Sequence, residues 1–200
     1  MNTETKLIKF EEGITLESGN HLESFELIVE TYGELNKSKS NGVLLCHAFS
    51  GNHHAAGKSE DGSIGWWDQL VGSDKAIDTD KYFVVCCNNL GGCSGSSGPT
   101  SINPQTGKIY GKDFPQVSVL DWVNSQKMLS EKLGINKWHL VIGGSLGGMQ
   151  ALQWSITFPD SVNKAGILAA AAKSSTQNIA LNEVARAVSY THLTLPTTLT

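Results

Sequence analysis

The sequence contains no apolar run that approaches the roughly 20 residues needed to cross a membrane. Its first residues, MNTETKLIKFEEG, also lack the apolar segment of a secretory signal. Basic residues are not in excess, because 15 lysines and arginines stand against 19 aspartates and glutamates. A polyanionic partner is therefore not indicated. These shortages predict a cytoplasmic protein that binds neither a membrane nor nucleic acid.

Cysteine is also scarce, with only Cys46, Cys86, Cys87 and Cys93 in 200 residues. Their spacing is not that of metal-ligand pairs, and two of them are adjacent inside an apolar run. This arrangement is typical of small hydrophobic side chains in the core of a protein from a reducing compartment. We therefore expect the cysteines to serve packing, with no metal bound.

The length and the composition, 40% hydrophobic and 17% charged, predict one soluble globular domain. Residues 25–32, FELIVETY, alternate apolar and polar side chains as a half-buried strand does. Before them, residues 16–22, LESGNHL, carry a Ser-Gly-Asn turn signal between short apolar pieces. The sheet is therefore expected to begin with antiparallel strands.

Later apolar segments do not alternate, which is the pattern of parallel strands covered on both faces by helices. They occupy residues 42–47, 82–88, 138–144 and 165–171. Residues 117–135 show apolar side chains near helical spacing, and Gly134 follows as a stop signal. The predicted fold class is α/β, with a mostly parallel sheet, an antiparallel N-terminal hairpin and this helix as one crossover.

Two segments lack apolar periodicity. Residues 91–116 are rich in glycine, serine and proline, and we interpret this long loop as a wall of a functional site, with a flexible linker as the alternative. Residues 189–200, SYTHLTLPTTLT, show no helical pattern, and we interpret them as a non-native tail outside the domain of residues 1–188. A native disordered tail is the alternative.

Ser145 stands in Gly143-Gly144-Ser145-Leu146-Gly147, which matches the G-x-S-x-G pattern of a nucleophile turn. An apolar strand runs into the motif, and a run without helix breakers follows Gly148 until Pro159. The small residues would permit a strained turn, since side chains at 143 and 147 would collide with the neighbouring strand and helix. We predict Ser145 as a nucleophile; a closely packed glycine turn or a helix-capping serine is the alternative.

A serine nucleophile of this kind needs two backbone amides that stabilise the oxyanion of the tetrahedral intermediate. The amide of Leu146 is the first candidate, because it follows the serine directly. The second is expected in the loop after an early strand, here the stretch VLLCHAFSGNHH. We predict the amide of Phe49, with that of Ala48 as the alternative.

The histidines do not supply the expected base. His53 and His54 have no carboxylate or cysteine at ligand spacing, which argues against a metal. On a sheet of this kind the order along the chain is serine, then Asp or Glu, then His. Only His192 follows Ser145, and it lies in the suspected tail. We therefore expect the chain to lack the base and to be truncated after the strand that follows the nucleophile helix.

With these motifs established, the chain resembles the homoserine O-acyltransferase family of α/β-hydrolase-fold enzymes from about residue 25 to residue 188. Its signature stretches are CHAFSGNHHAAG (46–57), GWWDQLVGSDKAIDTDKYFVVCCNNLGGCSGSSGPTSINPQTGKIYG (65–111), DFPQVSVLDWVNSQK (113–127), VIGGSLGGMQALQWSITFPD (141–160) and SSTQNIALNEVAR (174–186). In this family Ser145 takes the position of the nucleophile, and Phe49 and Leu146 take the oxyanion positions.

The resemblance implies acyl transfer from an acyl-CoA to the hydroxyl of L-homoserine in methionine biosynthesis, through an acyl-serine. Acetyl-CoA is the expected donor, succinyl-CoA is the alternative, and serine remains open as the acceptor. Neither a bound cofactor nor a metal is implied. The family's full-length members are homodimers in which a helical lid and the triad Asp and His come later in the chain. This chain is therefore expected to be an N-terminal fragment that is inactive alone.

Two rival functions remain open from the sequence. A serine esterase or peptidase of the same fold would carry the same nucleophile turn, and only the stretches 65–68 and 88–111 favour the transferase. A non-catalytic interaction domain would explain the missing base. The intact turn and oxyanion loop favour an enzyme fragment over such a domain.

Overall fold

The computed structural model describes residues 2–194, and residues 1 and 195–200 lie outside that description. The chain forms two units, residues 1–170 and residues 171–200, which are described separately. The strands of the first unit are β1 (Thr3–Phe10), β2 (Ile14–Thr15), β3 (His21–Leu22), β4 (Phe25–Tyr32), β5 (Gly42–Cys46), β6 (Val71–Gly72), β7 (Ile77–Asp78), β8 (Phe83–Cys87), β9 (Leu140–Gly144) and β10 (Ala165–Leu168). Its α-helices are α1 (Val119–Lys132) and α2 (Leu146–Thr157), with short 3₁₀ turns at Gly111–Asp113 and Pro159–Ser161.

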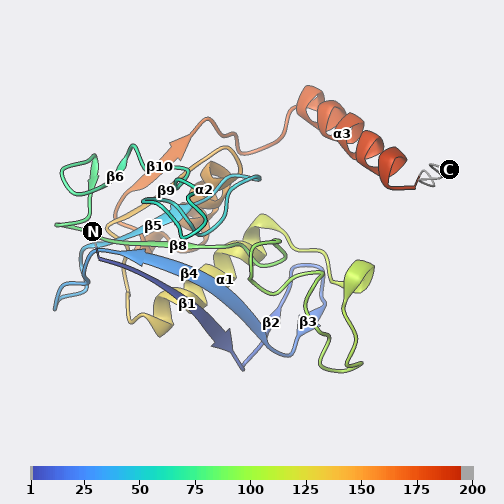
Figure 1. The fold of residues 1–200 in the computed structure, drawn as a ribbon, viewed down its shortest axis with the longest axis horizontal. Helices are drawn as coiled ribbons and strands as arrows, with labels where there is room; N and C mark the ends of the chain where they lie inside the picture. The colour runs from blue at the N-terminus through green and yellow to red at the C-terminus, as the bar shows by residue number, and fades with distance from the viewer. Residues whose placement is uncertain (1, 195–200) are drawn as a thin grey trace. The chain divides into compact units, whose positions relative to one another are not determined.

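The main sheet has the strand order β1-β4-β8-β5-β9-β10. The strands β8, β5, β9 and β10 run parallel, whereas β4 pairs antiparallel with both β8 and β1. Figure 1 shows β1 and β4 as two long neighbouring arrows. The predicted mostly parallel sheet with an antiparallel N-terminal start is confirmed. The turn signal in residues 16–22 is confirmed as well, because it joins β2 to β3 in a small antiparallel ladder.

The strand β1 was not predicted from the sequence. It pairs with β4 over its whole length, from Thr3 opposite Tyr32 to Phe10 opposite Phe25. Most of its side chains are exposed and only Phe10 is buried, as expected for a strand at the edge of a sheet. An edge strand needs little apolar surface, so hydrophobic periodicity does not reveal it.

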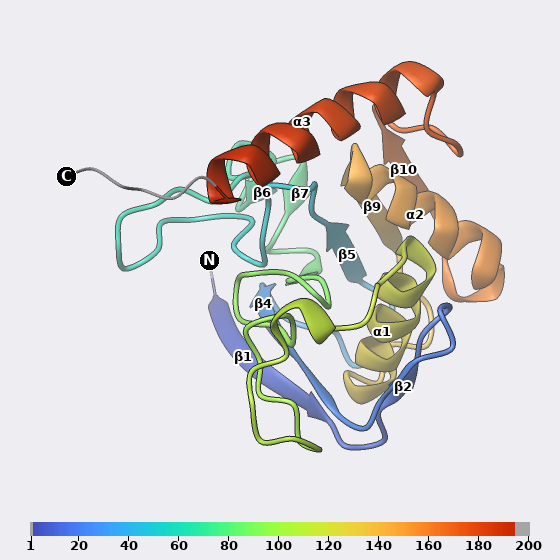
Figure 2. The same ribbon diagram turned by 90° about the vertical axis from the view of Figure 1, so that its right-hand side faces the viewer.

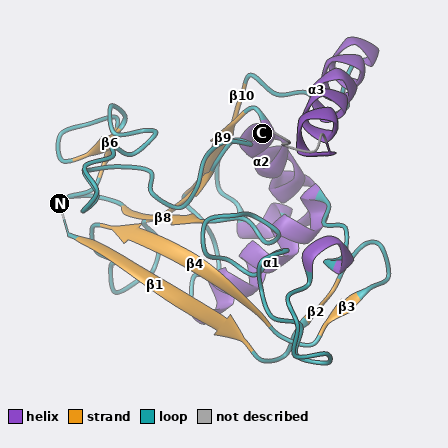
Figure 3. Cartoon of the chain, turned by 45° about the vertical axis from the view of Figure 1, so that its right-hand side comes forward, coloured by secondary structure: helices purple, strands orange, loops and turns teal. Residues whose placement is uncertain are grey.

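Of the parallel strands, β5 and β8 are buried on both faces, as predicted, whereas β9 is partly buried and β10 is mostly exposed. In β5, Leu44 and Cys46 point into one hydrophobic cluster, and Val43 and Leu45 point into another. The first cluster contains the buried faces of α1 and α2, which lie beside each other in Figure 2. The second cluster is completed by the segment between β5 and β8, drawn mostly as loop in Figure 3. The expectation that helices cover both faces is therefore wrong for this second face of residues 2–170.

The helix α1 lies within residues 117–135, as predicted, and adjacent residues close both of its ends. Ser118 caps the helix by accepting from the Asp121 amide at 3.3 Å, and the Asp121 carboxylate accepts from the Ser118 amide at 2.8 Å. Such a capping box satisfies two amides that the first turn leaves unpaired. Gly134 follows the helix with φ +69°, a left-handed conformation that favours glycine.

The long loop of residues 91–116 is packed on the sheet. The Ser97 amide donates to the Glu26 carbonyl at 2.8 Å, and the Ser97 hydroxyl accepts from the Glu26 amide at 2.8 Å. The Ser96 hydroxyl accepts from the Ile28 amide at 3.1 Å. The loop is therefore bonded along β4, and the alternative of a flexible linker is wrong.

The described part of the second unit, residues 171–194, contains one helix, α3 (Thr176–Thr194). This helix includes residues 189–194, for which the sequence showed no helical pattern and which were placed outside the domain. Extending an existing helix costs less than starting one, and no glycine or proline interrupts the sequence before Pro196. That residues 189–200 are non-native stays a prediction, and residues 195–200 lie outside the described part.

Candidate active site

Ser145 occupies a strained turn between β9 and α2. Its backbone has φ 54° and ψ −120°, a conformation that residues other than glycine rarely adopt. The turn is held on both sides, because the Ser145 amide donates to the Leu168 carbonyl of β10 at 3.0 Å and the Ser145 carbonyl accepts from the Met149 amide at 3.1 Å. The residue is exposed, and its hydroxyl makes no capping hydrogen bond to α2. The alternative of a helix-capping serine is therefore wrong.

The glycines around Ser145 allow the helix and strands to approach closely. A Cβ atom on Gly143 would lie 2.4 Å from the Gly147 carbonyl and 2.6 Å from the Cys46 carbonyl oxygen. A Cβ atom on Gly147 would lie 2.0 Å from that same Cys46 oxygen. The predicted collisions at positions 143 and 147 are thus confirmed. They bring the start of α2 directly against the end of β5, where the second oxyanion amide is expected.

The two predicted oxyanion residues line one pocket of about 310 Å³. Leu146 is the first residue of α2, and Phe49 lies in the loop after β5. Within residues 2–194, neither amide donates a hydrogen bond to another residue. Two free donors at one pocket fit the requirement for oxyanion stabilisation. The roles of Ser145, Phe49 and Leu146 stay predictions.

The rest of this pocket is formed by the ends of β5 and β8, by α1 and by the long loop. Its wall is mainly apolar and includes Leu90, Phe114, Val117 and Trp122. The Trp122 indole donates to the Leu90 carbonyl at 2.7 Å, which fixes the ring against the loop. An apolar wall with a few fixed polar groups is the usual form of a small-molecule site. The interpretation of residues 91–116 as a wall is supported by Gly91, Gly92 and Pro99, which line the same pocket.

The adjacent histidines are tied into the loop that follows β5. The His54 Nδ1 atom lies 3.0 Å from the Glu30 carboxylate of β4, and both side chains are largely buried. Burial lowers the pKa of His53 below its ordinary value. Within residues 2–194, no three side chains of His, Cys, Asp or Glu gather as metal ligands. The Glu30–His54 pair anchors the loop to the sheet, a contact that the sequence did not reveal.

Three of the four cysteines fill the core as predicted, but Cys93 is exposed in the long loop. Burial raises the pKa of Cys87 to about 12 and also raises the pKa of Cys46 and Cys86. Thiols held protonated in this way are poor nucleophiles and poor metal ligands. No helix in the described range of 2–194 has the length and apolar character of a membrane span.

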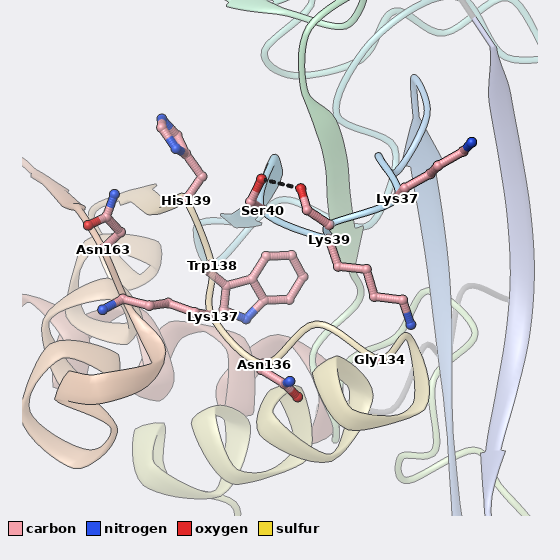
Figure 4. A pocket seen from close by; sticks show the side chains of 10 residues that line it. Lys37, Lys39, Ser40, Gly134, Asn136, Lys137, Trp138, His139 and Asn163 are labelled. Atoms are coloured by element: carbon pink, nitrogen blue, oxygen red, sulfur yellow. Dashed lines mark hydrogen bonds between the residues drawn. The ribbon is translucent and has the colours of Figure 1, made fainter.

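Figure 4 shows a different pocket, of about 480 Å³, at the amino ends of β5 and β9. It is lined by three lysines, but Lys37 and Lys137 extend in opposite directions and Lys39 points toward Gly134. The cationic groups therefore do not converge on one ligand. In open α/β sheets, ligands bind at the carboxyl ends of the strands. That is where Ser145 lies.

A strained serine at a strand-to-helix turn on a mostly parallel sheet defines the α/β-hydrolase class. A family model described as the alpha/beta hydrolase fold matches residues 41–197, and the chain belongs to this family. Within it, the resemblance to homoserine O-acyltransferases is confirmed. The chain is 61% identical over 181 residues to the homoserine O-succinyltransferase of Neisseria gonorrhoeae, a match that covers 90% of this chain and 48% of that protein.

Solved structures agree with this placement. A homoserine O-acetyltransferase from Bacillus anthracis is 39% identical with a TM-score of 0.77, and the match covers 82% of this chain and 46% of that one. An esterase is 39% identical with a TM-score of 0.84, and the match covers 92% of this chain and 52% of that one. The chain thus spans about half the length of the relatives that it matches.

Proposed function

We propose that this chain carries the nucleophile and the oxyanion amides of a homoserine O-acyltransferase, with Ser145 as the residue that accepts the acyl group. The observation that supports this proposal most strongly is the side chain of Ser145, an exposed residue whose hydroxyl caps no amide of α2. It stands at a strained turn, next to a pocket lined by Phe49 and Leu146, whose amides donate to no other residue within 2–194.

The proposed reaction has two steps. The Ser145 Oγ attacks the thioester carbonyl of an acyl-CoA, its proton passes to a base, and the carbon–sulfur bond breaks to release CoA as a thiol. The base has by then given the serine proton to the CoA sulfur, so it can accept the proton of the L-homoserine hydroxyl as that hydroxyl attacks the acyl-serine. It passes this proton to the Ser145 oxygen as the bond between that oxygen and the acyl carbon breaks. The Phe49 and Leu146 amides would stabilise the oxyanion of both tetrahedral intermediates. No step needs a bound cofactor or metal.

We place the succinyl group ahead of the acetyl group as the one transferred. The relative that is 61% identical is named a succinyltransferase, whereas the acetyltransferase of known structure is 39% identical. This ranking reverses the expectation of acetyl-CoA from the sequence. Succinyl-CoA, acetyl-CoA and L-homoserine are therefore the small molecules to test.

A serine esterase is the second candidate, because the esterase structure has the higher TM-score, 0.84 against 0.77. The two functions differ in what removes the acyl group from the serine. In a transferase the acceptor alcohol does so, whereas in an esterase water does. A site that excludes water favours transfer, although both use one nucleophile.

The test begins with acylation of Ser145. The chain is incubated with p-nitrophenyl succinate or p-nitrophenyl acetate, and the intact mass is measured against a Ser145→Ala control. We expect one acyl group on the original chain and none on the control. Equal acylation of both proteins would refute the proposal. The acylated chain is then divided between buffer and L-homoserine, and loss of the acyl group is followed. Faster loss with homoserine, with O-acylhomoserine as product, supports the transferase. Equal rates of loss support the esterase.

The chain alone is expected not to turn over, since five of its six histidines precede Ser145 and the expected base follows the nucleophile in this fold. Residues 1–188 are mixed with an acyl-CoA and L-homoserine, and free thiol is measured over time. We expect at most one thiol per chain. Sustained thiol release would contradict the expectation that the chain is inactive alone.

A further inference from the structure

The loop that carries Phe49 begins with a buried histidine whose two ring nitrogens are both bonded. His47 is only 4% exposed. Its Nε2 atom lies 3.1 Å from the Asn89 backbone nitrogen, and its Nδ1 atom lies 2.8 Å from the Ala48 carbonyl oxygen. A backbone amide can only donate and a carbonyl can only accept. The ring is therefore neutral, with its proton on Nδ1, and that proton is donated to Ala48.

The Ala48 carbonyl oxygen is held by a second donor. The Gly51 amide donates to it at 3.0 Å, closing a tight turn over residues 48–51. The peptide bond between Ala48 and Phe49 is trans, so its N–H points away from its C=O. Fixing the Ala48 carbonyl toward His47 and Gly51 thus fixes the Phe49 amide in the opposite direction. That amide has no hydrogen-bond partner within residues 2–194.

The backbone of His47 is in turn connected to the nucleophile helix. Its carbonyl accepts from Gln150 Nε2 of α2 at 3.3 Å. Gln150 Oε1 accepts from Gln126 Nε2 of α1 at 2.7 Å, and Gln126 Oε1 accepts from the Trp154 indole at 2.7 Å. All these side chains are buried, at 1% exposure or less. Buried amides that are satisfied in this way hold one defined arrangement, because any movement would leave polar groups unpaired.

We propose that His47 is a positioning residue for acyl transfer: its Nδ1–H holds the Ala48 carbonyl, and thereby aims the Phe49 amide at the oxyanion that forms beside Ser145. The proposal rests on the proposed function of Ser145. His47 itself would touch neither the acyl group nor the acceptor. Its contribution is to keep one donor oriented before the reaction, which is the condition under which such donors are effective.

Two substitutions separate the roles of the two ring nitrogens. In His47→Asn, the side-chain amide can replace Nδ1 as the donor to Ala48 but cannot reach Asn89. In His47→Gln, the side-chain oxygen can replace Nε2 as the acceptor for the Asn89 amide, but the donor to Ala48 is lost. The two variants are similar in polarity. If His47 served only to tie the end of β5 to the end of β8 through Asn89, His47→Gln would be the better tolerated of the two variants.

The readout is the rate at which a fluorophosphonate probe labels Ser145, because the phosphoryl oxygen of the adduct occupies the oxyanion position. His47→Gln is expected to label about 100-fold more slowly, the usual effect of losing one oxyanion donor. His47→Asn is expected to stay within a few-fold of the original chain. Equal rates in the two variants, whether both high or both low, would overturn the proposal.

Two further measurements keep the outcomes distinct. Equal labelling of Ser145→Ala and the original chain would refute the proposed nucleophile itself. Labelling that requires Ser145 but has the same rate in both His47 variants would refute only the positioning role. Nitrogen-15 NMR of the histidine rings, on the unsubstituted chain, reports the tautomer without any reaction. We expect a protonated Nδ1 and an unprotonated Nε2 for His47, and the opposite tautomer would overturn the proposal even if the variants failed to fold.

Discussion

The contact between Gly147 and the end of β5 gives a sharp test of how the nucleophile turn is built. In Gly147→Ala, the new Cβ atom would lie 2.0 Å from the Cys46 carbonyl oxygen, 2.8 Å from its carbon and 3.1 Å from the His47 oxygen. Ordinary contacts of a Cβ atom begin at 3.4 Å. Both partners are backbone, so no flexible side chain can move aside. The start of α2 must shift away from β5.

The magnitude follows from two opposing effects. Forcing an extra methyl group into a packed interior costs about 1–3 kcal/mol. Replacing glycine by alanine in a helix returns up to about 1 kcal/mol. We expect a net loss of about 1–2 kcal/mol in the free energy of unfolding. The effect on Ser145 should be larger, because a displacement of about 1 Å at a reacting group can cost about 100-fold in rate.

The matched control is Gly144→Ala, only three residues away. A Cβ atom there would meet nothing within 4 Å, so the free energy of unfolding should change by less than about 0.5 kcal/mol. Urea unfolding can be followed by the fluorescence of the five tryptophans, and Ser145 reactivity by fluorophosphonate labelling. If the two variants unfold at the same urea concentration and label at the same rate, the close-approach argument is wrong.

Two other predictions concern buried polar groups. Gln126→Leu removes the acceptor of the Trp154 indole and the donor to Gln150, so each orphaned group should cost about 1–3 kcal/mol in urea unfolding. Lower pH should also destabilise the fold, because burial lowers the pKa of His47 and His53 from the ordinary 6.5. Below pH 6.5 the unfolded chain binds more protons than the folded one. The contribution of the two neutral histidines to the free energy of unfolding is therefore complete above pH 6.5 and is lost progressively as the pH falls toward their folded-state pKa values.

Each of these predictions has its own control. Gln153 lies on the same helix as Gln150, but it is half-buried and, within residues 2–194, its amide bonds only the Thr157 hydroxyl. Gln153→Leu should therefore cost far less than Gln126→Leu. A similar loss in both variants would show that the buried network adds little. For the pH effect, His47→Asn should show a shallower loss of stability between pH 7.5 and pH 5.5. If the free energy of unfolding falls equally with pH in the variant and in the original chain, His47 does not contribute to the pH dependence.

Much of the fold was readable from the sequence, because its signals are local. The unbroken apolar runs of β5, β8, β9 and β10 mark parallel strands, and each was placed within two or three residues at either end. Of these strands, β5 and β8 are buried on both faces. The glycine pattern around Ser145 marked the strained turn, since only small residues allow a helix and a strand to approach so closely. The capping serine and the glycine stop of α1 are likewise contained in a few adjacent residues.

Other features depend on partners far apart in the chain, and no pattern in the sequence announces them. The exposed strand β1 exists because β4 offers it a complete hydrogen-bonding edge. The segment between β5 and β8 covers the second face of the sheet where helices were expected. Helix α3 runs past residue 188 because propagation outweighs weak local propensity.

The chemistry of the site divides in the same way. The sequence alone indicated which hydroxyl is presented, because the small residues that permit the strained turn at Ser145 are its immediate neighbours. Only the tertiary structure decided how the Phe49 amide is aimed. Its direction depends on the His47 ring, which is bonded to the adjacent Ala48 and to Asn89, 42 residues further along the chain. Turns are encoded by adjacent residues, whereas hydrogen bonds between the ends of separate strands form only when the sheet has brought them together.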